Sequence, residues 1–254
     1  GDNGYVTLAA AIAAAEDGDT VKLLADSKED VAISKSITLD LGGKTLTNTD
    51  AGKATISVNN GVTATVKNGS IIGGTSYYNI EVTKDSNANL TLENVTATAG
   101  NTGSSMIDNW GTLTINSGTY TGGMNVVKSE EGSKLTINGG TFTGTYAKGW
   151  SYNGVILSAG TTKITGGEFI QNATTPAKSY PSVVLAMKVD GYPSTIEITG
   201  GKFINNKSDG KIFYGYGKAT SDNFEVSGGT FNKSISDGFC AEGFIPTKNA
   251  DGTY

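Results

Sequence analysis

The chain has neither histidine nor arginine, so all 19 basic residues among its 254 are lysines. This excludes histidine general bases, histidine-ligated metals and chemistry that depends on a guanidinium group. Cys240 is the single cysteine, which excludes an intrachain disulfide. A cysteine nucleophile is not expected either, because no histidine is present to activate the thiol.

Charge and long apolar runs are also scarce. Charged residues make up 17% of the chain, the net charge is −5, and the lysines form no basic cluster. We therefore expect no nucleic-acid partner. The longest purely apolar run, Leu8 to Ala15, is far too short to span a bilayer, so membrane insertion is not expected.

What the chain does contain is a repeat. LTINSGTYTG (Leu113 to Gly122) returns 22 residues later as LTINGGTFTG (Leu135 to Gly144), and related segments follow at intervals of 22 to 34 residues. Their central apolar residues are Leu39, Val66, Leu92, Ile115, Ile137, Ile164, Ile198 and Val226. Intervals of this length indicate a repeat architecture, and apolar residues at every second position indicate strands rather than helices.

Each repeat is expected to form three short strands joined by turns, so that equivalent residues of successive coils lie on top of one another. The central apolar residues would then form one buried column. A second, aromatic column would contain Tyr120, Phe142, Phe169, Phe203 and Phe231. On the outside, Glu168 is expected to pair with Lys202 of the next coil.

This pattern resembles the pectin-lyase-like superfamily, whose fold is an all-β, single-stranded, right-handed parallel β-helix. The resemblance implies three sheets, about eight or nine coils and a short N-terminal α-helical cap. Residues Val6 to Asp26 are similar to the N-terminal segment of that superfamily, with Thr7 as the expected N-cap and Gly18 as the expected end of the helix. We expect a single domain over residues 1–254, with the cap at 5–18 and the coils at 19–235.

The remaining residues, 236–254, are expected to be a C-terminal tail that starts a linker or a further module. Residues Gly238 to Tyr254 resemble a sequence segment that follows such repeats in surface proteins of gut anaerobic bacteria. The resemblance implies an extracellular or bacterial cell-surface location. We expect a monomer.

In this superfamily the ligand groove lies over the first sheet of the coil. That sheet is expected at Ile56 to Asn59, Ile80 to Thr83, Met106 to Asn109, Asn125 to Lys128, Val155 to Ser158, Val183 to Lys188 and Ile212 to Gly215. The turns that enter it carry Tyr77, Tyr78, Tyr146, Trp150, Tyr152 and Tyr180. Such a rim of aromatic rings is suited to sugar binding, and its alternative role is to pack over the long loops.

Turns that leave the first sheet carry the acidic residues Asp85, Glu130, Glu131 and Asp190. Carboxylates and turn carbonyls are ligands for Ca²⁺, and the alternative is an ordinary solvated turn. No D-x-D-x-D-G run supports a dedicated calcium loop. Apart from this calcium hypothesis we expect no cofactor.

A catalytic hypothesis rests on Glu81 and Asp108, which are expected to face outward on adjacent coils. Their carboxyl groups would lie roughly 5 Å apart, as in a retaining glycosidase. Two unrelated surface acids are the alternative. Pectate lyases of this fold use an arginine base, and polygalacturonases need further motifs beyond the Asn-Thr-Asp at Asn48 to Asp50, all of which are missing here.

A third possibility is ice binding, since Thr-x-Thr rows stack at Thr119, Thr121, Thr141 and Thr143, but two such coils do not form a plane. The sequence therefore favours a non-catalytic extracellular module that binds a glycan or a host surface ligand. The alternative is a carbohydrate-active enzyme that works with carboxylates on the first sheet.

Overall fold

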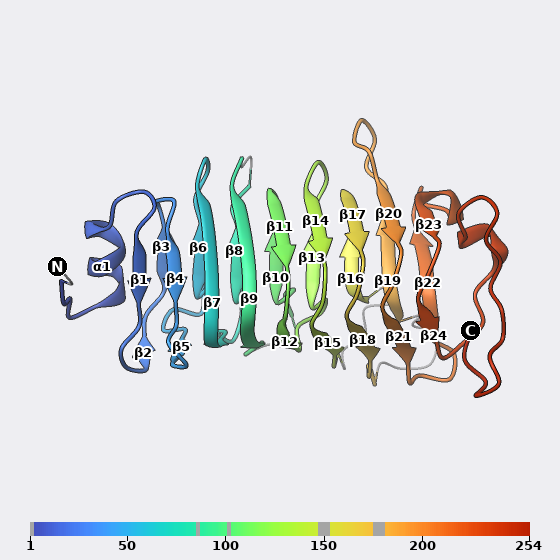
Figure 1. Cartoon of the computed structure of the whole chain (residues 1–254), viewed down its shortest axis with the longest axis horizontal. Coiled ribbons are helices and arrows are strands. Elements are labelled where there is room, and N and C mark those ends of the chain that lie inside the picture. The colour runs from blue at the N-terminus through green and yellow to red at the C-terminus, as the bar shows by residue number, and fades with distance from the viewer. Residues whose placement is uncertain (1–2, 85–86, 101–102, 147–152, 175–180) are drawn as a thin grey trace.

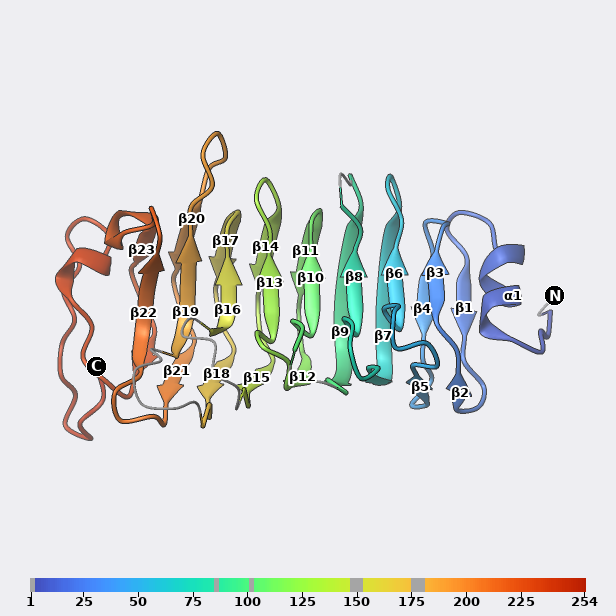
Figure 2. The ribbon, with the colours of Figure 1, turned by 180° about the vertical axis from the view of Figure 1, so that it is seen from behind.

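The computed structural model describes residues 3–84, 87–100, 103–146, 153–174 and 181–254. Its strands pair in parallel and its coils stack along one long axis, with the two termini at opposite ends (Figure 1). Figure 2 shows the same regular stack from behind. The predicted parallel β-helix is confirmed: the chain forms a β-solenoid of about seven turns, whose first sheet has eight strands.

This first sheet contains one strand from each of eight coils, in sequence order. They are β3 (Val31–Ile33), β6 (Ile56–Val58), β8 (Ile80–Val82), β10 (Ile107–Asn109), β13 (Val127–Ser129), β16 (Gly154–Ser158), β19 (Ser182–Met187) and β22 (Lys211–Tyr216). The predicted ranges agree with these strands within about two residues at most ends.

The other two walls join into one 16-stranded sheet. The second wall holds β1 (Thr20–Lys22), β4 (Thr38–Asp40), β11 (Thr112–Ile115), β14 (Lys134–Ile137), β17 (Thr161–Ile164), β20 (Thr195–Ile198) and β23 (Phe224–Val226). The third holds β2 (Ser27–Lys28), β5 (Thr45–Thr47), β12 (Gly118–Thr121), β15 (Thr141–Gly144), β18 (Glu168–Gln171), β21 (Lys202–Asn205) and β24 (Thr230–Phe231). Two long strands, β7 (Thr63–Ile72) and β9 (Asn89–Thr98), run through the corner between the walls.

Like residues lie over like residues, as predicted. Ile115 is the Cα partner of Ile137, which is in turn the partner of Ile164, and all three side chains are buried. The aromatic column is also present: ring centroids from Tyr120 to Phe231 are separated by 5.0, 5.0, 4.8 and 5.4 Å. Outside, Glu168 and Lys202 form the expected ion pair at 3.0 Å.

A short helix, α1 (Leu8–Ala14), covers the N-terminal end of the core with the buried side chains of Leu8 and Ile12. Thr7 is its N-cap, as predicted, and accepts a hydrogen bond from the Ala10 N–H at 3.1 Å. The helix ends at Ala14 rather than at Gly18, which has a φ of 93° in the turn before β1. No helix in the described ranges is long and apolar enough to cross a membrane.

The C-terminal residues pack onto the last coil. Two short helices lie in this part of the chain: η1 (Ser221–Asn223) precedes β23, and η2 (Asp237–Phe239) follows β24. Phe231 and Tyr254 exchange two backbone hydrogen bonds of 2.8 and 2.9 Å. The Ala241 N–H donates to the Val226 carbonyl at 2.9 Å, and the Phe239 ring packs against Phe224. Residues 236–254 therefore pack against the end of the core.

Candidate functional site

The outward face of the first sheet brings the two predicted carboxylates together. Glu81 in β8 and Asp108 in β10 are Cα partners on adjacent coils, with Ser57 before them and Lys128 after them in the same column. Because side chains alternate along a strand, all four leave the sheet on its outer side. Glu81 and Asp108 are therefore neighbours on adjacent coils.

Asp108, however, is not the exposed acid that was expected, since only 1% of it is accessible. The Trp110 indole Nε1–H donates to its Oδ2 at 2.9 Å, whereas its Oδ1 is buried and receives no hydrogen bond from any described residue. Burial, followed by the nearby Glu130 carboxylate, raises the pKa of Asp108 to about 7. Protonation would let the Asp108 carboxyl group donate a hydrogen bond to the Glu130 carboxylate.

Glu130 itself is 6% exposed and forms an ion pair with Lys128. This pairing places the Lys128 ammonium group beside the acidic cluster. Glu81 is half-buried, and this burial raises its pKa, although hydrogen bonds from Tyr77 and Ser57 oppose the effect.

The predicted calcium ligands that the structure describes do not form a group of three. Asp190 is exposed and paired with Lys218, while Glu130 is paired with Lys128, and Glu131 lies beside Glu130 in the turn after β13. Asp85 lies outside the described residues. Over the described part of the chain, no three acidic or cysteine side chains are grouped closely enough to hold a metal ion.

Two of the predicted aromatic residues lie beside the acids. The rings of Tyr77 and Tyr78 are 4.5 Å apart at an angle of 54°, and both side chains are partly exposed. The Tyr77 hydroxyl lies 3.5 Å from Glu81 Oε1. Burial and the neighbouring carboxylates raise the pKa of Tyr78, so its hydroxyl stays neutral and can donate hydrogen bonds.

The rest of the predicted aromatic rim is different. Tyr146 is 2% exposed, which makes it a packing residue rather than a rim residue. Trp150, Tyr152 and Tyr180 lie outside the described residues. Trp110 was not among the predicted site residues, yet it bonds to Asp108 and has the Lys84 ammonium 4.7 Å from its ring centroid. The sequence could have indicated Trp110, because it lies two residues after Asp108 and residues two apart along a strand direct their side chains to the same side of the sheet.

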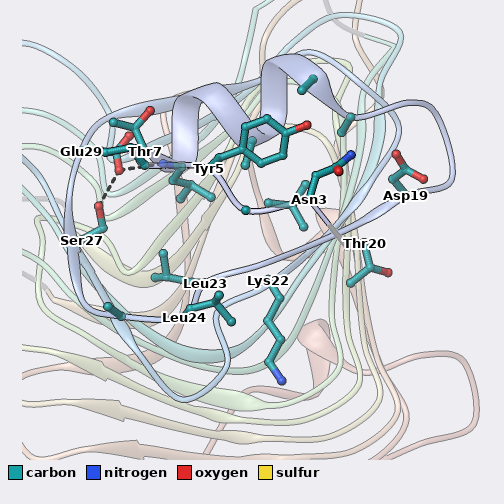
Figure 3. Close-up of a pocket in the computed structure, with 18 of the residues that line it drawn as sticks. Asn3, Tyr5, Thr7, Asp19, Thr20, Lys22, Leu23, Leu24, Ser27 and Glu29 are labelled. Carbon is teal, nitrogen blue, oxygen red and sulfur yellow. Dashed lines mark hydrogen bonds between the residues drawn. The ribbon is translucent and has the colours of Figure 1, made fainter. Parts of the chain in front are cut away.

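Two cavities lie at the ends of the solenoid rather than over the first sheet. One, of about 430 Å³, lies between α1 and the segment 19–29 (Figure 3). The other, of about 210 Å³, lies between the last coil and the C-terminal residues. None of the predicted site residues lines either of them.

No family model, curated protein or solved structure is significantly similar to this chain. The arrangement of its side chains is therefore the basis for a functional interpretation.

Proposed function

We propose that this protein is a non-catalytic extracellular β-helix module of a bacterial cell surface that binds carbohydrate over the first sheet. The binding patch consists of Tyr77, Tyr78 and Glu81. The observation that carries the proposal is the ring pair at 4.5 Å beside a half-buried carboxylate. Aromatic rings accept the apolar faces of sugars, while carboxylate and phenol oxygens bind sugar hydroxyls.

The burial of Asp108 supports a binding role over a catalytic one. A glycosidase of the retaining type needs two carboxyl groups that both reach the sugar. Here Glu81 is partly exposed, whereas Asp108 is covered and hydrogen-bonded to Trp110. A single accessible carboxylate can orient a sugar but cannot supply both the acid and the nucleophile.

A glycan array with the parent protein and single variants tests this function. We expect Tyr77→Ala and Tyr78→Ala each to weaken binding by about tenfold, because each removes a ring that stacks on the sugar. Tyr192→Ala is the matched control, since it removes another exposed tyrosine at a different turn. Absence of glycan binding by the parent, or binding that neither Tyr77→Ala nor Tyr78→Ala changes, rejects the proposal.

A carbohydrate-active enzyme is the second candidate, and one observation favours it. The carboxyl groups of Glu81 and Asp108 lie on adjacent coils in register, and the pKa of Asp108 near 7 suits a general acid. Hydrolysis of polysaccharide by the parent that is lost in both Glu81→Gln and Asp108→Asn would support this candidate. Turnover that survives Asp108→Asn, or no turnover at all, rules it out.

A further inference from the structure

The two ends of the solenoid differ in how their outermost strands are covered. At the C-terminal end, Phe231 pairs with Tyr254 and Val226 bridges to Cys240, so an extended segment occupies the strand edges. At the N-terminal end, β1 pairs with β4 and with no other strand of the described residues. The edge of β1 away from β4 thus lacks the kind of cover seen at the opposite end.

The hydrogen bonds around β1 show which backbone groups face this edge. The Thr38 N–H donates to the Asp19 carbonyl at 2.9 Å, and the Leu23 N–H donates to the Asp40 carbonyl at 2.8 Å. Because successive residues of a strand direct their N–H and C=O groups to opposite sides, the backbone groups of Thr20 and Lys22 point away from β4. Such a row of groups is a template for another strand.

The cavity of about 430 Å³ lies beside these groups, and both Thr20 and Lys22 line it. Figure 3 shows α1 on one side of it, the segment from Lys22 to Leu24 on the other, and the Tyr5 ring in between. Val6 is fully exposed and Leu24 is 76% exposed. An extended segment that enters here would find backbone partners on one side and apolar side chains around it.

The charged groups that line the cavity favour a cationic ligand. They are the carboxylates of Asp19, Asp26 and Glu29 and the ammonium group of Lys22. Each carboxylate accepts a hydrogen bond from a backbone N–H. Asp19 accepts from Glu16 at 2.8 Å, Asp26 accepts from Thr45 at 2.8 Å, and Glu29 accepts from Leu8 at 2.9 Å. Fixed negative charge at the rim attracts basic side chains and disfavours acidic ones.

We propose that the N-terminal end of the solenoid binds an extended, basic peptide segment of a partner protein, which adds a strand to the free edge of β1. In this mode backbone hydrogen bonds with Thr20 and Lys22 supply affinity. Alternate side chains of the peptide would contact Val6 and Leu24 and pair with the carboxylates at the rim. This site is separate from the carbohydrate patch on the first sheet.

Fluorescence anisotropy with a labelled hexapeptide of alternating lysine and valine tests the proposal on the whole chain. The decisive comparison is Lys22→Pro against Lys22→Ala. Both variants remove the same positive charge, but only proline removes the N–H that points away from β4, and proline is tolerated at such an edge position. We expect Lys22→Ala to bind as tightly as the parent or more tightly, and Lys22→Pro to bind roughly tenfold more weakly than Lys22→Ala.

A second peptide and a second variant keep the test independent of how well Lys22→Pro folds. A peptide of alternating glutamate and valine is expected not to bind, because it meets the three carboxylates. Leu24→Ser changes an exposed side chain and is expected to weaken binding of the lysine–valine peptide several-fold. Equal binding of both peptides, equal affinity of Lys22→Pro and Lys22→Ala, or no effect of Leu24→Ser would overturn the proposal.

Discussion

One inward column of the third wall changes its chemistry halfway along the solenoid. In the N-terminal coils it contains Leu46, Ile71 and Ala97, which are Cα partners in succession. Ala97 is the partner of Tyr120, and from there the column is aromatic to Phe231. The same backbone architecture therefore accommodates aliphatic side chains in its first part and stacked rings in its second.

The turn that precedes this column changes at the same coil. Before Ile71 and Ala97 the positive φ belongs to Asn68 (56°) and Asn94 (51°), whereas the turn before Leu46 has Gly42 and Gly43 at positive φ. In the second part the positive φ moves to a glycine two residues before each ring, as at Gly140 (107°) and Gly167 (103°). A Cβ on Gly167 would lie 3.3 Å from Phe169 Cζ, so the glycine makes room for the ring. Glycine and ring thus form one coupled element, which is absent before Ile71 and Ala97.

Removing a ring from the middle of the stack is expected to have the largest effect. Phe169→Ala should lower the free energy of unfolding by about 3–5 kcal/mol, because it leaves a large cavity and ends the ring contacts with both neighbours. Ile71→Ala, in the aliphatic part of the same column, should cost about 2–3 kcal/mol. Urea unfolding measures both. A cost for Phe169→Ala no greater than that for Ile71→Ala would contradict the special role of the stack.

The coupling between glycine and ring predicts the next effect. Gly167→Ala should cost about 1–3 kcal/mol, since a side chain at this φ is strained and its Cβ crowds the Phe169 ring. In a Phe169→Ala background the contact of the new Cβ with the ring is absent, although its 3.1 Å approach to the Gly140 carbonyl oxygen remains, so the same substitution should cost less. Urea unfolding of the two single variants and the double variant gives this interaction energy. Strict additivity of the two substitutions would show that glycine and ring are independent.

The outward column of the first sheet changes along the same axis, from Ser57, Glu81 and Asp108 to Leu157 and Leu185. Asp108 lies in the middle of this change, and its pKa is raised from 3.8 to about 7 by burial. The folded state therefore keeps a proton that the unfolded state releases, so the stability from this group is present below about pH 4 and is lost as the pH rises to about 7.

Asp108→Asn should abolish this part of the pH dependence. The parent is expected to lose stability over that range, by up to about 1.4 kcal/mol for each unit by which the pKa of Asp108 is raised. The variant keeps an acceptor for Trp110 and carries no ionisable group. Urea midpoints at several pH values measure the slope. An unchanged slope in Asp108→Asn would show that Asp108 is ionised in the fold throughout.

The strand order and register could be predicted from the sequence because each coil repeats the same apolar residues, and identical residues align only in one register. The aliphatic start of the third-wall column could not be predicted, since the segments around Leu46, Ile71 and Ala97 lack the motif that surrounds the later aromatic residues. Burial of Asp108 was also missed. Its exposure depends on Trp110, Glu130 and the tyrosine pair, and turns between coils follow no repeat that would predict such contacts.

Asn94→Gly is expected to have the smallest effect and provides the counterpart to Gly167→Ala. Glycine relieves the left-handed backbone at φ 51°, but it increases the entropy of the unfolded chain and removes the hydrogen bond from Asn94 Nδ2 to Asn68 Oδ1 at 3.3 Å. These contributions oppose one another, so the free energy of unfolding should change by less than about 0.5 kcal/mol. A loss of stability as large as that of Gly167→Ala would contradict this expectation. It would mean that the Asn94 side chain is required to form the turn.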